Sequence, residues 1–526
     1  MNRSAAGKEA MVVSPHALAS QAGAETLRRG GNAFDAAVAV SACLAVVYPH
    51  MTGLGGDAFW LTYSGADRAV RAYNASGRSA GLASRQAFDG ESGIPLRGIR
   101  SAITVPGMAD GWEAVQREYG RLSLAEALEP AIRCASHGFP LSPDQARNTA
   151  ERFELLRGTA ITSEIFVPEG VPPRQGERFL QRQLADTLRK LAAGGRDAFY
   201  KGEIARSISV FMEKNGGLLR AEDFADHAGE WTEPVRGSYR GLELFQVPPN
   251  SQGFTGIMIP QMLESFDLSG IEHGSYEYVH LLVEAAKMAF RDRDRVLTDP
   301  AFADIPVGAL VSADYCAELA ASIDLRRASP SVSRPVGSDT AYAAVVDGEG
   351  NAVSFIQSLY FEFGSGVTAG DTGILLQNRG SFFSLDPSHV NALKPRKRTF
   401  HTLMPAMACR EGKPYILYGT QGGEGQPQTQ SALLTRMVDY GLDPQAAIDA
   451  PRWVWGRTWG AKTQELKLEA RFGADVAMAL ASAGHEVRTV GAFDGIVGHA
   501  QAILIGDDGT RYGGADPRAD GGCAGW

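Results

Sequence analysis

The sequence predicts an α+β protein in which helices pack against central β-sheets. Apolar residues recur at helical spacing in residues 18–29 and 276–297, and residues 33–47 form a nearly continuous apolar run. Residues 340–346 and 352–355 are instead short β-type runs joined by an Asp-Gly-Glu-Gly-Asn turn. Helical and strand-like segments occur in mixed order along the chain. This order favours an α+β class with sheets at the centre.

Local signals define three of the helices. Ser14 and Pro15 precede residues 18–29 as an N-cap and a first-turn proline, and two glycines at 30–31 end that helix. Residues 33–47 contain Asp35 and are shorter than the about 20 residues that cross a bilayer. We therefore expect a buried helix there. Residues 276–297 end in alternating charges at 291–295, which predict an exposed helix face with internal ion pairs.

Composition limits the classes of function. A chain of 526 residues with 44% hydrophobic residues can form two or three domains or one large layered unit. The formal net charge of -9 argues against a nucleic-acid partner, which would favour a basic domain or stripe. One basic run, residues 394–398, is expected to be a solvated loop.

Targeting and ligand patterns point to a cytoplasmic protein without a metal or another cofactor. The first residues lack the apolar core of about 7–15 residues that a secretory signal needs. Five scattered cysteines without a Cys-x-x-Cys pair indicate neither a disulfide framework nor a zinc site. The ten histidines likewise show no ligand spacing.

Thr340 is the candidate nucleophile. It opens the first β-type run, and residues 322–338 before it are rich in Ser, Pro, Arg and Gly, which predicts a flexible connector. If the chain is cut between Asp339 and Thr340, the freed α-amine can act as general base for the threonine hydroxyl. Taken alone, Thr340 is better explained as an ordinary β-branched strand residue.

An ordered set of glycine-rich segments favours the interpretation of Thr340 as a nucleophile. Together the segments resemble the γ-glutamyltransferase family of N-terminal-nucleophile hydrolases. The set extends over nearly the whole chain: residues 30–37, 53–57, 105–107, 248–253, 340–355, 373–376, 419–423, 450–452 and 516–518.

The resemblance implies a four-layer αββα sandwich that cleaves itself into two chains. Residues 1–339 would form the α-chain and residues 340–526 the β-chain, and both would remain in one intertwined unit. A dimer of such units is left open. The resemblance also assigns the backbone N–H groups of Gly422 and Gly423 to the oxyanion hole, and the Ser358 hydroxyl to a hydrogen bond with the nucleophile.

Several pocket positions depart from the family pattern. The arginine that grips the donor α-carboxylate is replaced by Ser76, and the aspartate that holds the α-amine by Phe382. A buried ammonium without a partner costs about 1–3 kcal/mol or more, so glutathione is a doubtful substrate. The other substitutions are His401 and Thr402 for paired serines, and Tyr360 and Arg379 for two polar contacts.

A short acid amide with one carboxylate and no amine fits this altered pocket. Arg78, Arg379 or Arg398 is expected to meet the carboxylate. The loop after Arg379 resembles that of the oxamate amidohydrolases of purine and allantoin breakdown. The predicted reaction is hydrolysis of oxamate by water to oxalate and ammonia. Alternatives are a γ-glutamyl hydrolase or transpeptidase, a dicarboxylic-monoamide acylase, and an uncleaved member that only binds a small acid.

Overall fold

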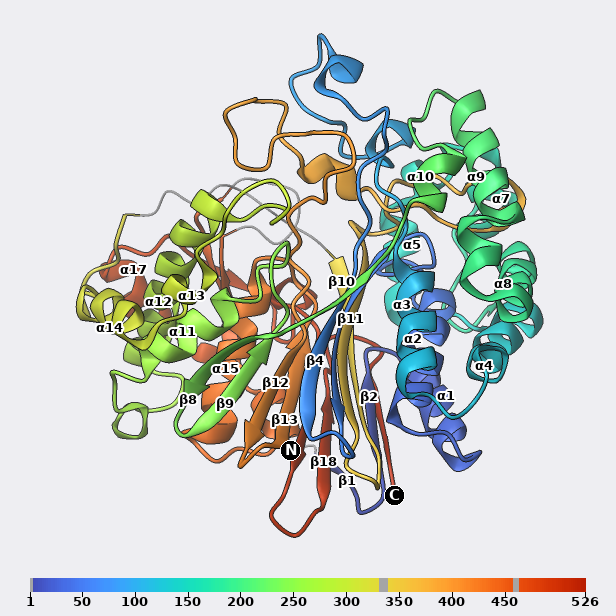
Figure 1. The fold of residues 1–526 in the computed structure, drawn as a ribbon. Coiled ribbons are helices and arrows are strands. Elements are labelled where there is room, and N and C mark those ends of the chain that lie inside the picture. The colour runs from blue at the N-terminus through green and yellow to red at the C-terminus, as the bar shows by residue number, and fades with distance from the viewer. Residues whose placement is uncertain (1–2, 331–338, 457–462) are drawn as a thin grey trace.

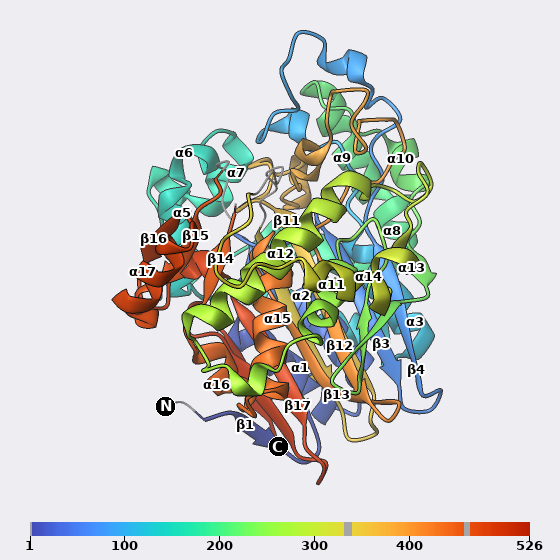
Figure 2. The same ribbon diagram turned by 90° about the vertical axis from the view of Figure 1, so that its left-hand side faces the viewer.

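The protein is a four-layer αββα sandwich. A computed structural model describes residues 3–330, 339–456 and 463–526, with Asp339 described by its backbone only. Figure 1 shows two β-sheets packed face to face in the middle, with one group of helices on the left and another on the right. Figure 2 views the layers from the side of the first group. The predicted α+β sandwich is confirmed.

Each central sheet is antiparallel and has seven strands. In spatial order, one sheet contains β1 (Ala5–Gly7), β18 (Arg511–Ala515), β17 (Ala500–Ile505), β13 (Lys413–Thr420), β12 (Ala406–Arg410), β9 (Leu242–Gln246) and β8 (Val235–Tyr239). The other contains β19 (Gly522–Gly525), β2 (Met11–Ser14), β10 (Asp339–Val346), β11 (Ala352–Tyr360), β3 (Asp57–Ser64), β4 (Ala69–Ala75) and β7 (Glu230–Thr232). Strands from before and after residue 340 therefore occur in both sheets.

The helices form the two outer layers (Figure 1). Those beside the sheet of β10 are α1 (Ala17–Arg28), α2 (Ala33–Val47), α3 (Met108–Tyr119), α4 (Leu124–His137), α8 (Arg182–Tyr200) and α9 (Glu203–Lys214), with the short α5 (Pro143–Glu151), α6 (Phe153–Leu156), α7 (Ala160–Phe166) and α10 (Ala221–Ala225). Those beside the sheet of β13 are α11 (Thr255–Leu263), α12 (Tyr276–Val296), α13 (Val307–Leu310), α14 (Ala313–Ala321), α15 (Gly425–Val438), α16 (Pro444–Asp449) and α17 (Ala474–Ser482). Smaller sheets pair β5 (Phe139–Pro140) with β6 (Arg178–Phe179), and β14 (Trp453–Trp455) with β15 (Leu466–Glu469) and β16 (Val487–Val490).

Three apolar clusters hold the layers together. One lies between the β10 sheet and its helices, and a second lies between the β13 sheet and its helices. The third, which includes Phe59, Tyr342, Ile356 and Leu417, fills the space between the two sheets. Burial on both faces explains why apolar residues in β10 and β11 do not simply alternate with polar ones.

The helix predictions are mostly confirmed. All fifteen residues of α2 are buried, and Asn32 and Asp35 form a capping box at its start. The first helix is confirmed as α1, but its predicted N-cap was wrong. Ser14 ends β2, and the Nδ1 atom of His16 accepts the Leu18 N–H instead. The described helices include none that is both long and apolar enough to span a membrane.

Two predictions about charged runs were wrong in part. Arg293, inside the alternating run at the end of α12, is completely buried, whereas Arg291 and Arg295 are exposed. In the basic run at 394–398, Lys397 and Arg398 are buried. In both runs the buried side chains have partners outside the run, which the local charge pattern does not reveal: Arg293 pairs with Glu424, Arg398 with Glu230, and Lys397 donates to the Val390 and Ala392 carbonyls.

Candidate active site

Thr340 lies near the start of β10, between β2 and β11, and its side chain is buried. The predicted hairpin with β11 is confirmed. Its register is irregular between Asp339, which faces Tyr360, and Ala341, which faces Gln357. Thr340 is therefore opposite Ser358 and its neighbour. The predicted connector falls partly at residues 331–338, which lie outside the described residues.

Ser358 lies near the end of β11, opposite Thr340. Its Oγ accepts the Tyr360 N–H at 2.7 Å and lies 3.4 Å from Nη2 of Arg379. Tyr360 has φ of 87°, a left-handed conformation that is unusual for a residue other than glycine. Such backbone outliers are concentrated at functional sites, where the surrounding structure holds them in place.

Arg379 is a fully buried cation in the short 3₁₀ helix Arg379–Phe382. Its guanidinium carbon lies 4.6 Å from the Tyr360 ring centre and 5.3 Å from that of Phe382, and the two rings stack at 4.3 Å. Nε and Nη1 have no hydrogen-bond partner among the described residues. Burial lowers the pKa of Arg379 to about 10, so the group stays charged at neutral pH.

His401 faces Asp57 at the same site. Its Nε2 lies 3.2 Å from Asp57 Oδ2, but at an angle that does not make a hydrogen bond. Both side chains are buried. Burial, helped by the nearby Arg379 charge, lowers the pKa of His401 to about 4. The imidazole is therefore neutral at pH 7 and leaves the positive charge of this region on Arg379.

Gly422 and Gly423 form the turn between β13 and α15. Their φ angles are 130° and 54°, in the range that favours glycine. Their carbonyl groups accept the N–H groups of Gly425 and Gln426 and so begin the helix. Nε2 of Gln426, in the helix that begins at this turn, lies 3.5 Å from Oγ1 of Thr340, the candidate nucleophile.

A buried hydrogen-bond network supports the glycine turn, and it was not predicted from the sequence. Gln252 Nε2 donates to the carbonyls of Gly423 at 3.2 Å and Thr402 at 3.0 Å. Arg293 donates to Gln252 Oε1 and to Glu424 Oε1, each at 2.8 Å. Gln252 belongs to one of the glycine-rich segments, which was a usable signal. Arg293 gave none, because it looked like one more charge in an exposed run.

The other predicted arginines are placed differently. Arg398 forms an ion pair with Glu230 and donates to the Ser76 carbonyl at 3.1 Å, which makes it part of the scaffold. Arg78 is half-buried and lines a cavity of about 280 Å³ that also includes His227 and Arg396. Ser76, which replaces the usual arginine, donates to Asn74 Oδ1 at 2.6 Å. Arg379 is the predicted arginine that the structure brings against Ser358.

Comparison with known proteins identifies the family. The family model described as Gamma-glutamyltranspeptidase matches residues 19–526. The chain belongs to the gamma-glutamyltranspeptidase family. It is accordingly an enzyme of the N-terminal-nucleophile hydrolase class that acts on amides.

The relatives are named for different activities. The "Glutathione hydrolase-like YwrD proenzyme" of Bacillus subtilis (strain 168) is 61% identical over 525 residues, covering 100% of both chains. The "Oxamate amidohydrolase proenzyme" of Klebsiella pneumoniae is 42% identical over 531 residues, again covering 100% of both. The solved cephalosporin acylase from Bacillus halodurans aligns with a TM-score of 0.93 at 36% identity, covering 100% of this chain and 97% of the other.

Proposed function

We propose that this protein is a self-processing amidohydrolase that cleaves a short acid amide, with oxamate as its substrate, through an acyl-Thr340 intermediate. The single observation that carries the proposal is the buried, incompletely paired Arg379 guanidinium next to Ser358. A guanidinium can bind a carboxylate through two parallel N–H donors. The two edges of the group are Nε with Nη2 and Nη1 with Nη2, so each edge joins a nitrogen without a described partner to the one that contacts Ser358.

The position of Arg379 favours a short substrate. Arg379 contacts Ser358, and the strand register places Thr340 opposite Ser358. A carboxylate held by Arg379 would therefore be close to the carbonyl that Thr340 attacks. In oxamate these two groups are directly bonded, whereas a γ-glutamyl donor separates them by three carbons.

Maturation begins with attack of the Thr340 hydroxyl on the Asp339 carbonyl. The peptide nitrogen leaves as the new α-amine of Thr340, and water hydrolyses the resulting ester to give a chain of residues 1–339 and a chain of 340–526. Both central sheets combine strands from the two ranges, so the chains stay together after the cut. That both relatives above are named proenzymes supports this step.

Turnover then uses the freed amine as general base. The Thr340 oxygen adds to the amide carbonyl, and N–H groups of Gly422 and Gly423 stabilise the oxyanion. The amide nitrogen takes a proton and leaves as ammonia. Water releases oxalate from the acyl-threonine and restores the hydroxyl. Tyr360, Phe382, His401 and Thr402 would form the walls of the acyl pocket, and Arg78 stays a prediction as a further substrate contact.

A γ-glutamyl hydrolase is the second candidate, because the 61% identical relative is named glutathione hydrolase-like. The two candidate functions differ in what the pocket must supply. A γ-glutamyl donor carries an ammonium group that needs an anionic partner, whereas oxamate carries none. Phe382 stacks on Tyr360 at the position where the family pattern has an aspartate.

The test is release of ammonia or glutamate from oxamate, glutamine and glutathione by the mature protein. We expect the highest kcat/KM for oxamate. A higher kcat/KM for glutathione would reject the oxamate assignment in favour of the glutamyl one.

A further inference from the structure

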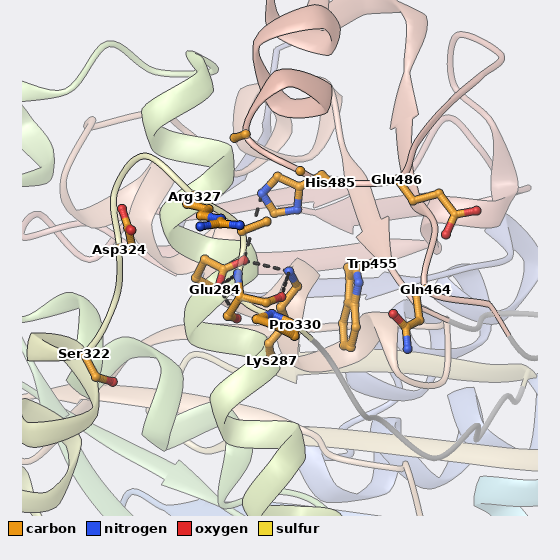
Figure 3. A pocket seen from close by; sticks show the side chains of 14 residues that line it. Glu284, Lys287, Ser322, Asp324, Arg327, Pro330, Trp455, Gln464, His485 and Glu486 are labelled. Atoms are coloured by element: carbon orange, nitrogen blue, oxygen red, sulfur yellow. Dashed lines mark hydrogen bonds and ion pairs between the residues drawn. The ribbon is translucent and has the colours of Figure 1, made fainter.

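A second polar site lies away from Thr340, in a cavity of about 750 Å³. The cavity is bounded by α12, by residues 322–330 and by residues 483–486 after α17. Figure 3 shows Glu284, Lys287 and His485 gathered at its centre, with Trp455 beside them. None of these side chains takes part in the amidohydrolase mechanism above.

Three buried ligand groups meet beside this cavity, and two of them, Glu284 and His485, line it. His280 and Glu284 are one helical turn apart on α12, and His485 reaches them from the segment after α17. Their donor atoms all lie within 4.8 Å of one another. His280 Nδ1 is 2.8 Å from His485 Nε2, which in turn is 4.0 Å from Glu284 Oε1. Two imidazoles and one carboxylate are a donor set that suits a borderline-soft divalent ion.

The surroundings already orient the ligands. Nε2 of His280 lies 2.8 Å from the Asp324 carbonyl, to which it can only donate, so Nδ1 carries the lone pair that faces the cluster. The N–H of Ser329 donates to Glu284 Oε2 at 3.0 Å, which leaves Oε1 on the side of His485. Metal-binding histidines are usually held by such a hydrogen bond from the second ring nitrogen.

We propose that His280, Glu284 and His485 bind a divalent transition-metal ion such as Zn²⁺, with water from the cavity as a fourth ligand. The bound ion would take the place of the one proton shared by the two imidazoles. His280 and His485 are 205 residues apart, which explains why histidine spacing in the sequence gave no sign of the site.

Lys287 is the competing cation. Its Nζ lies 2.7 Å from Glu284 Oε1, the oxygen that the metal needs. It also has alternative contacts, because the Ser329 carbonyl is 3.3 Å away and the Trp455 ring centre 5.6 Å away. The ammonium can therefore move aside and keep partners. Replacing Lys287 with methionine should remove the competition and tighten metal binding.

The site also joins two parts of the chain. His280 and Glu284 precede residue 340, and His485 follows it. If the self-cleavage proposed above occurs, the ion links the α-chain to the β-chain and adds to the stability of the mature pair. Metal binding itself does not depend on cleavage, so it should also be found in an uncleaved Thr340→Ala protein.

The experiment is titration of metal-free protein with Zn²⁺ by calorimetry and with Co²⁺ by visible absorption, which reports imidazole coordination. Losing an outer-shell partner typically weakens metal binding by about 10–100-fold, and losing a direct ligand costs more. We expect 1:1 binding that is lost in His485→Ala and Glu284→Gln, and that is tighter in Lys287→Met. His137→Ala, which removes an exposed histidine on α4, is the control and should bind as the parent does.

Two outcomes would overturn the proposal. One is metal binding that His485→Ala and His137→Ala retain to the same extent, which would mean that only surface histidines bind the ion. The other is a Lys287→Met protein that binds no metal, which would mean that His280 and His485 form only a hydrogen-bonded pair. Because His485→Ala can fail to fold, His485→Gln and the circular dichroism of each variant complete the set. A zinc-dependent rise in melting temperature, seen in the parent and absent in Glu284→Gln, checks the site without any activity assay.

Discussion

Replacing Arg379 with alanine should abolish most activity on oxamate and leave the fold intact. Nε or Nη1, together with the second N–H of Nη2, offers two donors on one edge of the guanidinium for a substrate carboxylate. A hydrogen bond to a charged group contributes about 1.5–3 kcal/mol, so two amount to about 3–6 kcal/mol. At 1.4 kcal/mol for each factor of ten, kcat/KM for oxamate should fall by about 10²–10⁴-fold.

The same arginine should make the free enzyme less stable. Burial lowers its pKa because the charged form is poorly solvated there. Arg379→Met keeps most of the side-chain volume and removes the charge, so its melting temperature should equal or exceed that of the parent. A structural arginine behaves in the opposite way, since its loss leaves buried partners unpaired.

The assay compares oxamate with oxamide, in which a neutral carboxamide replaces the carboxylate. Arg379→Ala should lower the rate of ammonia release from oxamate much more than from oxamide. Arg396→Ala is the matched control, because Arg396 is exposed and forms an ion pair with Asp226 at the surface. Equal losses of activity on oxamate and oxamide in Arg379→Ala would refute the assignment of Arg379 as the residue that binds the carboxylate. A selective loss of activity on oxamate in Arg78→Ala, and not in Arg379→Ala, would refute it as well.

The remaining predictions concern the oxyanion turn, its support and acid stability. Gly423→Val should lower kcat by about 100-fold or more, because a bulky side chain at a φ of 54° displaces the backbone N–H from the oxyanion; a variant that matures and keeps its kcat would remove this role. Arg293→Gln should cost about 3–5 kcal/mol of unfolding free energy, because it removes the positive charge that is paired with the buried Glu424 carboxylate; an unchanged urea midpoint would contradict it. His16, His227 and His401 have pKa values lowered to about 4 by burial. The unfolded chain therefore binds more protons below about pH 6.5, and stability should be full above that pH and fall towards pH 4, as melting temperatures across this range will show.

The sequence predicted the elements that carry local signals. The nearly uniform apolar run of α2, and the β10–β11 hairpin with its Asp347 turn, are properties of contiguous residues. The same local patterns failed for Arg293. An arginine in an alternating run reads as exposed, and its burial depends on Gln252 and Glu424, which come from other parts of the chain.

In the candidate site, too, the sequence predicted some features, and others depend on packing between distant segments. Thr340, Gly422 and Gly423 lie in segments with recognisable composition, and Gln426, three residues after Gly423, lies 3.5 Å from Thr340 Oγ1. The sequence left three arginines as equal candidates for the carboxylate. Only the packing separates them, since it pairs Arg398 with Glu230 and leaves two nitrogens of Arg379 without a described partner.

The central claim is that Thr340 becomes the N-terminal nucleophile of this enzyme. Intact-mass measurement of freshly purified protein tests it most directly, together with the N-terminal sequence of the smaller fragment. We predict two fragments that correspond to residues 1–339 and 340–526, and a single uncleaved chain without amidase activity for Thr340→Ala. A full-length parent protein with full amidase activity would contradict the account.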